Sequence, residues 1–148
     1  MTTFTTRLNL EKPTQGVSPW KTPVDKWADQ LDKVAAQYLS VHLSGVAIAT
    51  EVFFDGFFFD EDVTITKVTM YAREAPSGAA FSIDFTKGGS IQTKIATIAD
   101  GLKKGTTTIA GLTYATTEEL GLKVTGVGSV NAGSEITILI HYNVSPLA

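Results

Sequence analysis

Two spacings of hydrophobic residues divide the chain. Between Thr22 and Leu39, apolar residues recur at intervals of three and four, the spacing of one face of an α-helix. These residues are Val24, Trp27, Ala28, Leu31, Val34, Ala35 and Tyr38. Thr22 is a suitable N-cap, and Pro23 fits the first helical position because its missing N–H is not needed there. The pattern predicts an amphipathic helix over residues 22–40.

From about Val46 onward, apolar and polar residues alternate, which is the period of a half-buried β-strand. The clearest alternating sets of apolar residues are Phe81, Ile83 and Phe85, then Leu120, Leu122 and Val124, then Ile136, Ile138, Ile140 and Tyr142. Between Ile65 and Val68 the alternation changes phase, which predicts a β-bulge near Thr66 and Lys67.

Turn-forming sequences separate these alternating runs. They are Asp55-Gly56, Pro76-Ser77-Gly78, Lys87-Gly88-Gly89, Asp100-Gly101, Lys104-Gly105 and Asn131-Ala132-Gly133. Their spacing predicts about seven or eight short strands. We therefore expect a mainly β protein in which residues 41–148 form an antiparallel β-sandwich, of either the jelly-roll or the immunoglobulin-like type.

Residues 1–21 show no sustained period and contain Pro13, Gly16 and Pro19, which predicts an extended arm. The arm and the predicted helix nevertheless carry the apolar residues Leu8, Leu10, Trp20, Trp27 and Leu31. A tryptophan ring can bury about 150–250 Å², and a helix of this length is only marginally stable alone. These residues therefore need a surface to pack on, either the sandwich or a neighbouring subunit.

Five phenylalanines within seven positions are the sharpest anomaly of composition. They are Phe53, Phe54, Phe57, Phe58 and Phe59. Alternation directs only about half of such a run into one core. The others are expected to lie under the predicted helix or at a subunit boundary, and Phe57 and Phe58 are the candidates for such a contact.

Charge and composition exclude several classes of protein. The chain has 148 residues, a net charge of −3 and scattered Lys and Arg residues, so no basic stripe for nucleic acid is present. It contains no cysteine, which excludes disulfides and thiolate nucleophiles. The opening residues lack the apolar region of a signal peptide, and the longest apolar stretch, residues 45–59, is too short and too interrupted for a membrane helix. We expect a single globular domain made in the cytoplasm.

Candidate chemistry is sparse. His42 and His141 are the only histidines, and no nucleophile or metal-ligand spacing accompanies them, so we expect no enzyme and no cofactor. Asp60-Glu61-Asp62 beside Asp55 has the oxygen ligands that Ca²⁺ takes, although a solvated turn is the simpler interpretation. The segment 126–129 is similar to a fragment of a dinucleotide fingerprint, but it ends a predicted strand and is interpreted as a turn.

The N-terminal sequence resembles the leader of many tailed-bacteriophage virion proteins. The matching residues are Thr6-Arg7-Leu8-Asn9-Leu10-Glu11-Lys12-Pro13, then Gly16 and Trp20, then Trp27-Ala28-Asp29-Gln30-Leu31-Asp32-Lys33-Val34. The likeness covers about the first 35 residues, and Asp25, Asp29 and Asp32 replace the asparagine usual in that helix. The remainder is similar, more loosely, to the Gly- and Thr-rich sandwich modules of phage fibres and capsid decoration proteins.

The resemblance implies a non-enzymatic virion protein that attaches through its leader and displays a β-sandwich. A capsid decoration or cement protein, assembled as a homo-oligomer and by resemblance a trimer, is the first expectation. A tail-fibre, baseplate or receptor-binding component that contacts a host-surface glycan is the alternative. A small hydrolase on a sandwich scaffold is a third hypothesis, since fold does not determine function.

Overall fold

The computed structural model describes residues 3–4, 11–12 and 37–144. The two short strands β1 (Thr3–Phe4) and β2 (Glu11–Lys12) pair antiparallel and belong to a unit separate from the one that begins at Gln37. Residues 22–36 of the predicted helix lie outside the described residues. We refer to residues 37–144 as the body.

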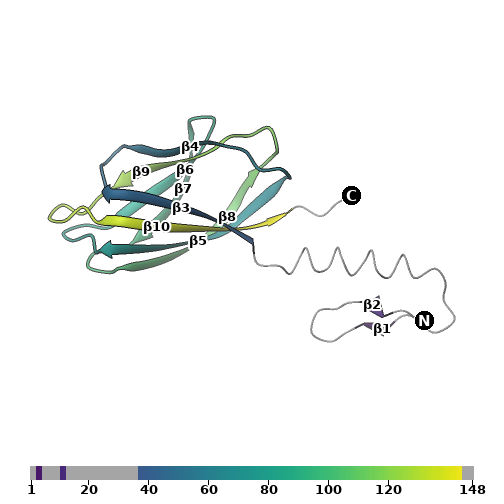
Figure 1. Cartoon of the computed structure of the whole chain (residues 1–148), viewed down its shortest axis with the longest axis horizontal. Coiled ribbons are helices and arrows are strands. Elements are labelled where there is room, and N and C mark those ends of the chain that lie inside the picture. Colours follow the sequence, from purple (N-terminus) through teal and green to yellow (C-terminus); the bar gives the residue numbers. More distant parts are fainter. Residues whose placement is uncertain (1–2, 5–10, 13–36, 145–148) are drawn as a thin grey trace. The chain divides into compact units, whose positions relative to one another are not determined.

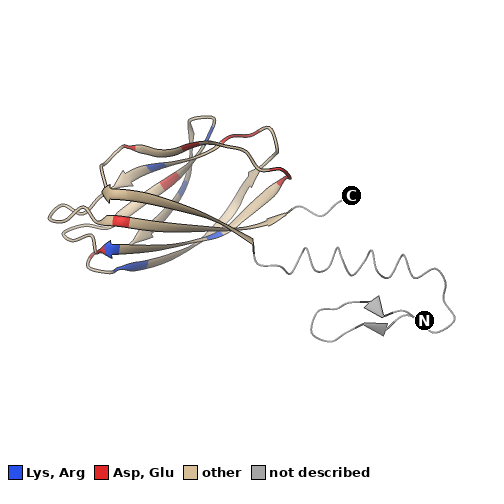
Figure 2. Cartoon of the chain, in the orientation of Figure 1, with Lys and Arg blue, Asp and Glu red and all other residues tan. Residues whose placement is uncertain are grey.

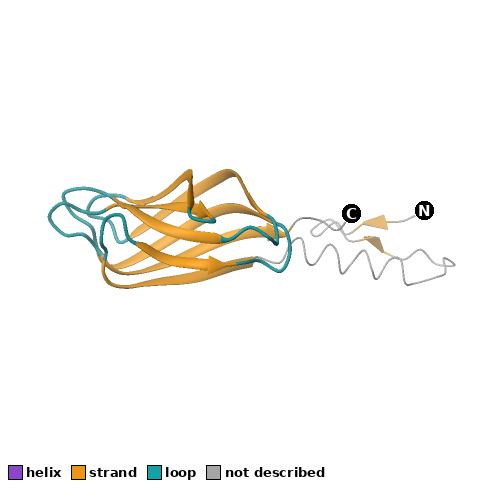
Figure 3. Cartoon of the chain, turned by 90° about the horizontal axis from the view of Figure 1, so that it is seen from above, coloured by secondary structure: helices purple, strands orange, loops and turns teal. Residues whose placement is uncertain are grey.

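The body consists of two antiparallel sheets of four strands each. Its strands are β3 (Gln37–Val46), β4 (Val52–Phe57), β5 (Val63–Glu74), β6 (Phe81–Lys87), β7 (Ser90–Ile98), β8 (Lys104–Tyr114), β9 (Leu120–Gly126) and β10 (Ser134–Val144). One sheet has the order β3-β10-β5-β8 and the other β4-β9-β6-β7. The two layers are visible in Figures 1 and 3, so the expected sandwich is confirmed for the body.

Strand pairing in the body is nested. The first strand pairs with the last, β3 with β10, and the next pairs inward are β4 with β9, β5 with β8 and β6 with β7. Two further pairings, β10 with β5 and β9 with β6, complete the sheets. The body thus has the topology of one long hairpin, with its turn at Gly88 and Gly89 between β6 and β7, and this hairpin folds into two layers.

The core lies between the sheets and is made by the predicted alternating residues. Phe81, Ile83 and Phe85 are fully buried, as are the inward residues of β9 and of the first part of β10. They are joined by Val68, Met70, Ile98, Leu112 and Tyr114. Each sheet covers the inner face of the other, which is the burial that a sandwich requires.

The register places every loop of the body at one of two ends. Gln37 pairs with Tyr142, and Val63 pairs with both Val144 and Tyr114, so the start of β3 and the end of β10 lie beside the loops 58–62 and 115–119. We call this the chain-terminal end. The loops 47–51, 75–80, 99–103 and 127–133 lie at the opposite, distal end, on the left in Figure 1.

Three local predictions need correction. Strand β3 begins at Gln37, so residues 37–40 are strand rather than the last turn of a helix. The helical spacing overlapped an equally good alternation of Leu39, Val41 and Leu43, which pair along β10. Asp55-Gly56 and Lys104-Gly105 lie inside β4 and β8 and are not connecting turns.

The predicted bulge is confirmed at Thr66. His141 pairs with Lys67 and Tyr142 with Ile65, so Thr66 is the extra residue, and its hydroxyl donates to the His141 carbonyl at 3.2 Å. A second bulge, in β7, is closed by a buried carboxylate.

That second bulge lies opposite Phe85. Asp84 is 3% exposed, and its Oδ1 accepts from the backbone N–H groups of Phe85 and Lys94, each at 2.8 Å. Thr93 on the bulged strand has a φ of 57°. The carboxylate thus replaces the ladder hydrogen bonds that the bulge removes.

Candidate functional site

The outward face of the sheet β3-β10-β5-β8 brings both histidines to one surface. Its cross-strand rows, read from the register, contain Tyr38, His42, Lys67, Tyr71, Lys104, Thr137 and His141, and Glu135 joins them through its contact with His42. We call these eight residues the histidine face. His42 and His141 both lie on the outer side of the sheet.

A hydrogen-bond chain connects His42 to β10. Its Nδ1 lies 3.2 Å from Thr137 Oγ1, and its Nε2 lies 2.8 Å from Glu135 Oε2. The same carboxylate accepts from Gly45 N at 2.8 Å. Glu135 has a φ of 48°, an unfavourable region for a residue with a side chain. The strained backbone therefore directs the carboxylate back toward β3.

The pKa of Glu135 lies below its ordinary value, first because Gly45 N–H donates to it and second because His42 does. The order hydroxyl, imidazole and carboxylate is that of a nucleophilic triad. However, Thr137 lies on β10, which pairs on both sides, so backbone N–H groups near its hydroxyl are committed to the sheet. The hydrogen bonds among Thr137, His42 and Glu135 tie β3 to the irregular start of β10.

The remaining residues of this face are aromatic and basic. The rings of Tyr38 and His141 lie 6.0 Å apart, and Lys104 Nζ lies 5.5 Å from the centre of the Tyr71 ring. Tyr38 is 58% exposed and Tyr71 42%. The pKa of His141 is lowered by partial burial and by the nearby charge of Lys67. Exposed tyrosines beside cations are typical of surfaces that bind proteins or sugars.

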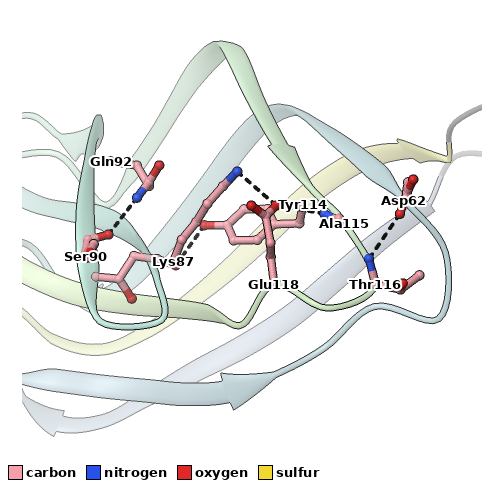
Figure 4. Close-up of polar contacts among 9 residues, drawn as sticks. Asp62, Lys87, Ser90, Gln92, Tyr114, Ala115, Thr116 and Glu118 are labelled. Carbon is pink, nitrogen blue, oxygen red and sulfur yellow. Dashed lines mark hydrogen bonds and ion pairs between the residues drawn. The ribbon is translucent and has the colours of Figure 1, made fainter.

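Polar contacts organise the chain-terminal end (Figure 4). Glu118 Oε2 accepts from Ala115 N at 2.9 Å and from Lys87 Nζ at 3.1 Å, and the first of these contacts is the larger cause of its lowered pKa. Asp62 Oδ1 accepts from Thr116 N at 3.1 Å. These contacts fix the loop 115–119 against β6 and the loop 58–62.

Tyr114 anchors this end in the core. Its hydroxyl donates to the carbonyl of Thr86 at 3.0 Å, and Lys87 Nζ lies 5.1 Å from the centre of its ring. Burial, with smaller contributions from Glu118 and Asp84, raises its pKa far above the ordinary value. Tyr114 is therefore a neutral hydrogen-bond donor at any physiological pH.

A pair of carboxylates lies beside this cluster. Gly56 N donates to Asp55 Oδ1 at 3.0 Å and to Glu119 Oε1 at 3.1 Å, so the two side chains converge on one amide. A hydrogen bond to Asp55 and repulsion from it raise the pKa of Glu119. Acidic residues gather at this end (Figure 2), where Asp60, Glu61 and Asp62 also lie.

The five phenylalanines pack mainly on one another and on the core. Phe59 is buried, and Phe53, Phe54 and Phe57 pack against the core cluster. The rings of Phe57 and Phe59 lie 5.0 Å apart, edge to face. Phe58 is 51% exposed. Of the two predicted contact residues in this run, Phe57 is thus partly covered within the body, and Phe58 is available at its surface.

The other predicted contact residues are Leu8, Leu10, Trp20, Trp27 and Leu31, and all five lie outside the described residues. The distal end carries exposed aliphatic residues that the sequence analysis did not single out. They are Val46, Ile48, Leu102 and Val130, the last of which is 84% exposed. Flanking Gly and Asn residues would have indicated a loop there, but not that several loops meet at one end.

Within the described part of the chain, no group of three or more His, Asp or Glu side chains is placed to hold a metal ion. The same residues contain no helix that is long and apolar enough to cross a membrane. No protein-family model matches the sequence, and a search of curated proteins finds no relative.

Proposed function

We propose that this protein is a non-enzymatic virion structural protein, most simply a capsid decoration or cement protein that docks through residues 1–36 and displays the body. The observation that carries the proposal is that the body closes its own core. Its two sheets bury each other's inner faces with side chains from residues 41–140. The apolar residues of the leader are thus not needed to complete that core, and we propose that they contact another surface.

The strand order supports this proposal. The nested pairing of β3 with β10, β4 with β9, β5 with β8 and β6 with β7 is the pattern of a jelly roll rather than of an immunoglobulin-like sandwich. Jelly rolls are common in viral capsid and lectin domains. We therefore propose the jelly-roll type for the body.

The position of the two ends of the body suits display. Gln37 and Val144 lie at the chain-terminal end, so a leader held by a particle leaves the distal loops exposed. Repetition of the same contact on a particle converts weak docking into strong retention by effective concentration. A homo-oligomer, with a trimer favoured, fits this role, and the leader contributes its contacts through Leu8, Leu10, Trp20, Trp27 and Leu31.

A tail-fibre, baseplate or receptor-binding component is the second candidate. Two features of the body favour this second candidate. They are the exposed tyrosines of the histidine face and the exposed aliphatic residues of the distal end. Aromatic platforms with neighbouring polar groups are what sugar sites use. Binding of the isolated body to a glycan array, abolished by Tyr38→Ala with Tyr71→Ala, would support this candidate over decoration.

The test compares the full chain, a double variant with Trp20→Ser and Trp27→Ser, and residues 37–148 alone. We expect the full chain to be oligomeric by light scattering and to bind purified capsids. The other two proteins should be monomeric and fail to bind, while their far-UV circular dichroism and melting temperature remain those of the sandwich. A strictly monomeric full chain without affinity for capsids or tails would refute the proposal.

A further inference from the structure

Oxygen atoms converge over one glycine near the chain-terminal end. Gly121 lies on β9, between β4 and β6, and alternation with the buried Leu120 and Leu122 places it on the side of the sheet away from the core, where it is itself buried. A methyl group there would lie 2.9 Å from Asp55 Oδ1, 3.2 Å from the carbonyl oxygen of Phe54, and against Thr86 Oγ1. Glycine leaves this space to the three oxygens.

The hydroxyl of Thr86 is the unusual member of the group. Thr86 is 2% exposed, and its Oγ1 is a buried side-chain atom without a hydrogen-bond partner. Such an atom costs about 1–3 kcal/mol relative to a paired one. It points into the same space as the Asp55 carboxylate, which comes from the bulge of β4.

A second carboxylate completes the arrangement. Glu119 precedes β9 and meets Asp55 at the amide of Gly56. The two acids come from different strands or loops, so their approach is a product of the fold rather than of a local acidic run. Lys87, which pairs with Leu120 in the ladder, forms an ion pair with Glu118.

We propose that Asp55, Glu119 and Thr86 form a binding site for a hard divalent cation, with Ca²⁺ as the favoured ion. The donors are all oxygens, namely two carboxylates, a hydroxyl and the Phe54 carbonyl, which is the ligand chemistry of Ca²⁺ and Mg²⁺. The donor set is irregular and comes from β4, from β6 and from the loop that precedes β9. Ca²⁺ tolerates such geometry, whereas Mg²⁺ requires a nearly ideal octahedron.

The electrostatics of the pair agree with the site. Without a cation, the two carboxylates converge on the amide of Gly56 and repel each other. A divalent ion placed between them removes this repulsion and gives the Thr86 oxygen a partner. The site is distinct from the acidic loop 60–62, because Asp62 is already used in capping Thr116 N. The site contains two acidic side chains, which agrees with the absence of any metal-binding group of three or more His, Asp or Glu side chains among the described residues.

The consequence is local stiffening. β4 is an edge strand whose pairing with β9 is interrupted between Phe54 and Phe57. A bound cation joins β4, β9 and β6 where hydrogen bonds are missing. This inference depends on the body alone and does not require the proposed virion role.

The test is calcium titration of the full chain by isothermal titration calorimetry at pH 7. With two carboxylates, we expect one site with a dissociation constant of about 0.1–1 mM, the range of weak calcium modules. The amide signals of Gly56 and Gly121 should shift in ¹H–¹⁵N spectra, and Mg²⁺ should bind more weakly. Absence of binding at millimolar CaCl₂, which would indicate a site occupied by water only, would overturn the proposal.

Variants separate this site from the general negative charge of the region. Asp55→Asn and Glu119→Gln should each weaken binding about tenfold or more, because each removes a charged ligand. Thr86→Val keeps the shape but removes the oxygen, so it should weaken binding severalfold while the calcium-free melting temperature stays unchanged or rises.

The matched control is Asp60→Asn with Glu61→Gln, which removes two exposed carboxylates at the same end of the body. It should change the affinity less than about twofold, because distant exposed charges are screened. An equal loss of affinity in this control, or unchanged affinity in Thr86→Val, would overturn the assignment of the site.

Discussion

Gly105→Ala tests whether the two sheets meet as tightly as the structure shows. Gly105 lies on β8, and a methyl group there would lie 2.9 Å from Ile98 Cα and directly against the carbonyl oxygen of Thr97 on β7. Both obstacles are backbone atoms, so relief requires strand β8 to move away from β7. Such overpacking costs about 1–3 kcal/mol, and an immovable backbone places this site at the upper end, about 2–3 kcal/mol.

The measurement is urea unfolding of the body followed by far-UV circular dichroism. Residues 37–144 contain no tryptophan, so unfolding of the isolated body is not followed by indole fluorescence. A loss of this size lowers the melting temperature by about 8–20 °C, with an unchanged m-value if the transition remains two-state. The matched control is Gly101→Ala. Gly101 has a φ of 76° and open space around it, so it carries only a conformational cost of about 1 kcal/mol. A Gly105→Ala protein at least as stable as Gly101→Ala would refute the reasoning.

Two further predictions concern the bulge in β7 and the response to acid. Asp84→Ala removes the acceptor of two backbone N–H groups and should cost about 2–4 kcal/mol, whereas Asp84→Asn keeps one acceptor oxygen and should cost less. Equal losses in urea unfolding would contradict this account. The lowered pKa values of Glu118 and Glu135 mean that their stabilisation is present above the unfolded-state pKa and is lost as pH falls through the folded one. The lowered pKa of His141 acts in the same direction below about pH 6.5, so the melting temperature should fall from pH 7 to pH 4. The raised pKa of Glu119 makes the folded state more stable as the pH falls, so Glu119→Gln should make the fall in melting temperature steeper. A melting temperature that does not change with pH would contradict the assignment of acid sensitivity to these groups.

Alternation of residue type predicted most of the body because burial of one sheet face imposes it. Phe81, Ile83 and Phe85 could be placed in the core, and the phase change located the bulge at Thr66. The start of β3 could not be predicted in this way. Apolar residues there satisfy helical and strand spacings together, and only pairing with β10 decides between them.

Glycine signals were ambiguous for a physical reason. Asp55-Gly56 has the chemistry of a turn, but a bulge inside a strand demands the same positive φ, here 73°. Gly105 does not have a positive φ, and its role is to admit the neighbouring backbone of β7. A single sequence does not distinguish a glycine needed for conformation from one needed for space.

The candidate surfaces were the least predictable part because they depend on register between distant strands. His42 and Thr137 are 95 residues apart and meet only because the first strand pairs with the last. Gly56, whose amide binds both Asp55 and Glu119, is 63 positions from Glu119, and the two meet through the pairing of β4 with β9. In each case the residue types are ordinary, and the topology creates the site.

The same topology gives the proposed attachment a mechanical basis. The leader continues into β3, an edge strand that pairs with β10 from Gln37 to Leu43 and again at Val46. A force applied through the leader along this strand is shared by the hydrogen bonds of the whole ladder, because they run perpendicular to it. The bonds between His42, Thr137 and Glu135 add side-chain ties across the same pair of strands. If the body is held on a particle through the residues before Gln37, the force acts along β3. This is the direction in which β3 best resists separation from β10.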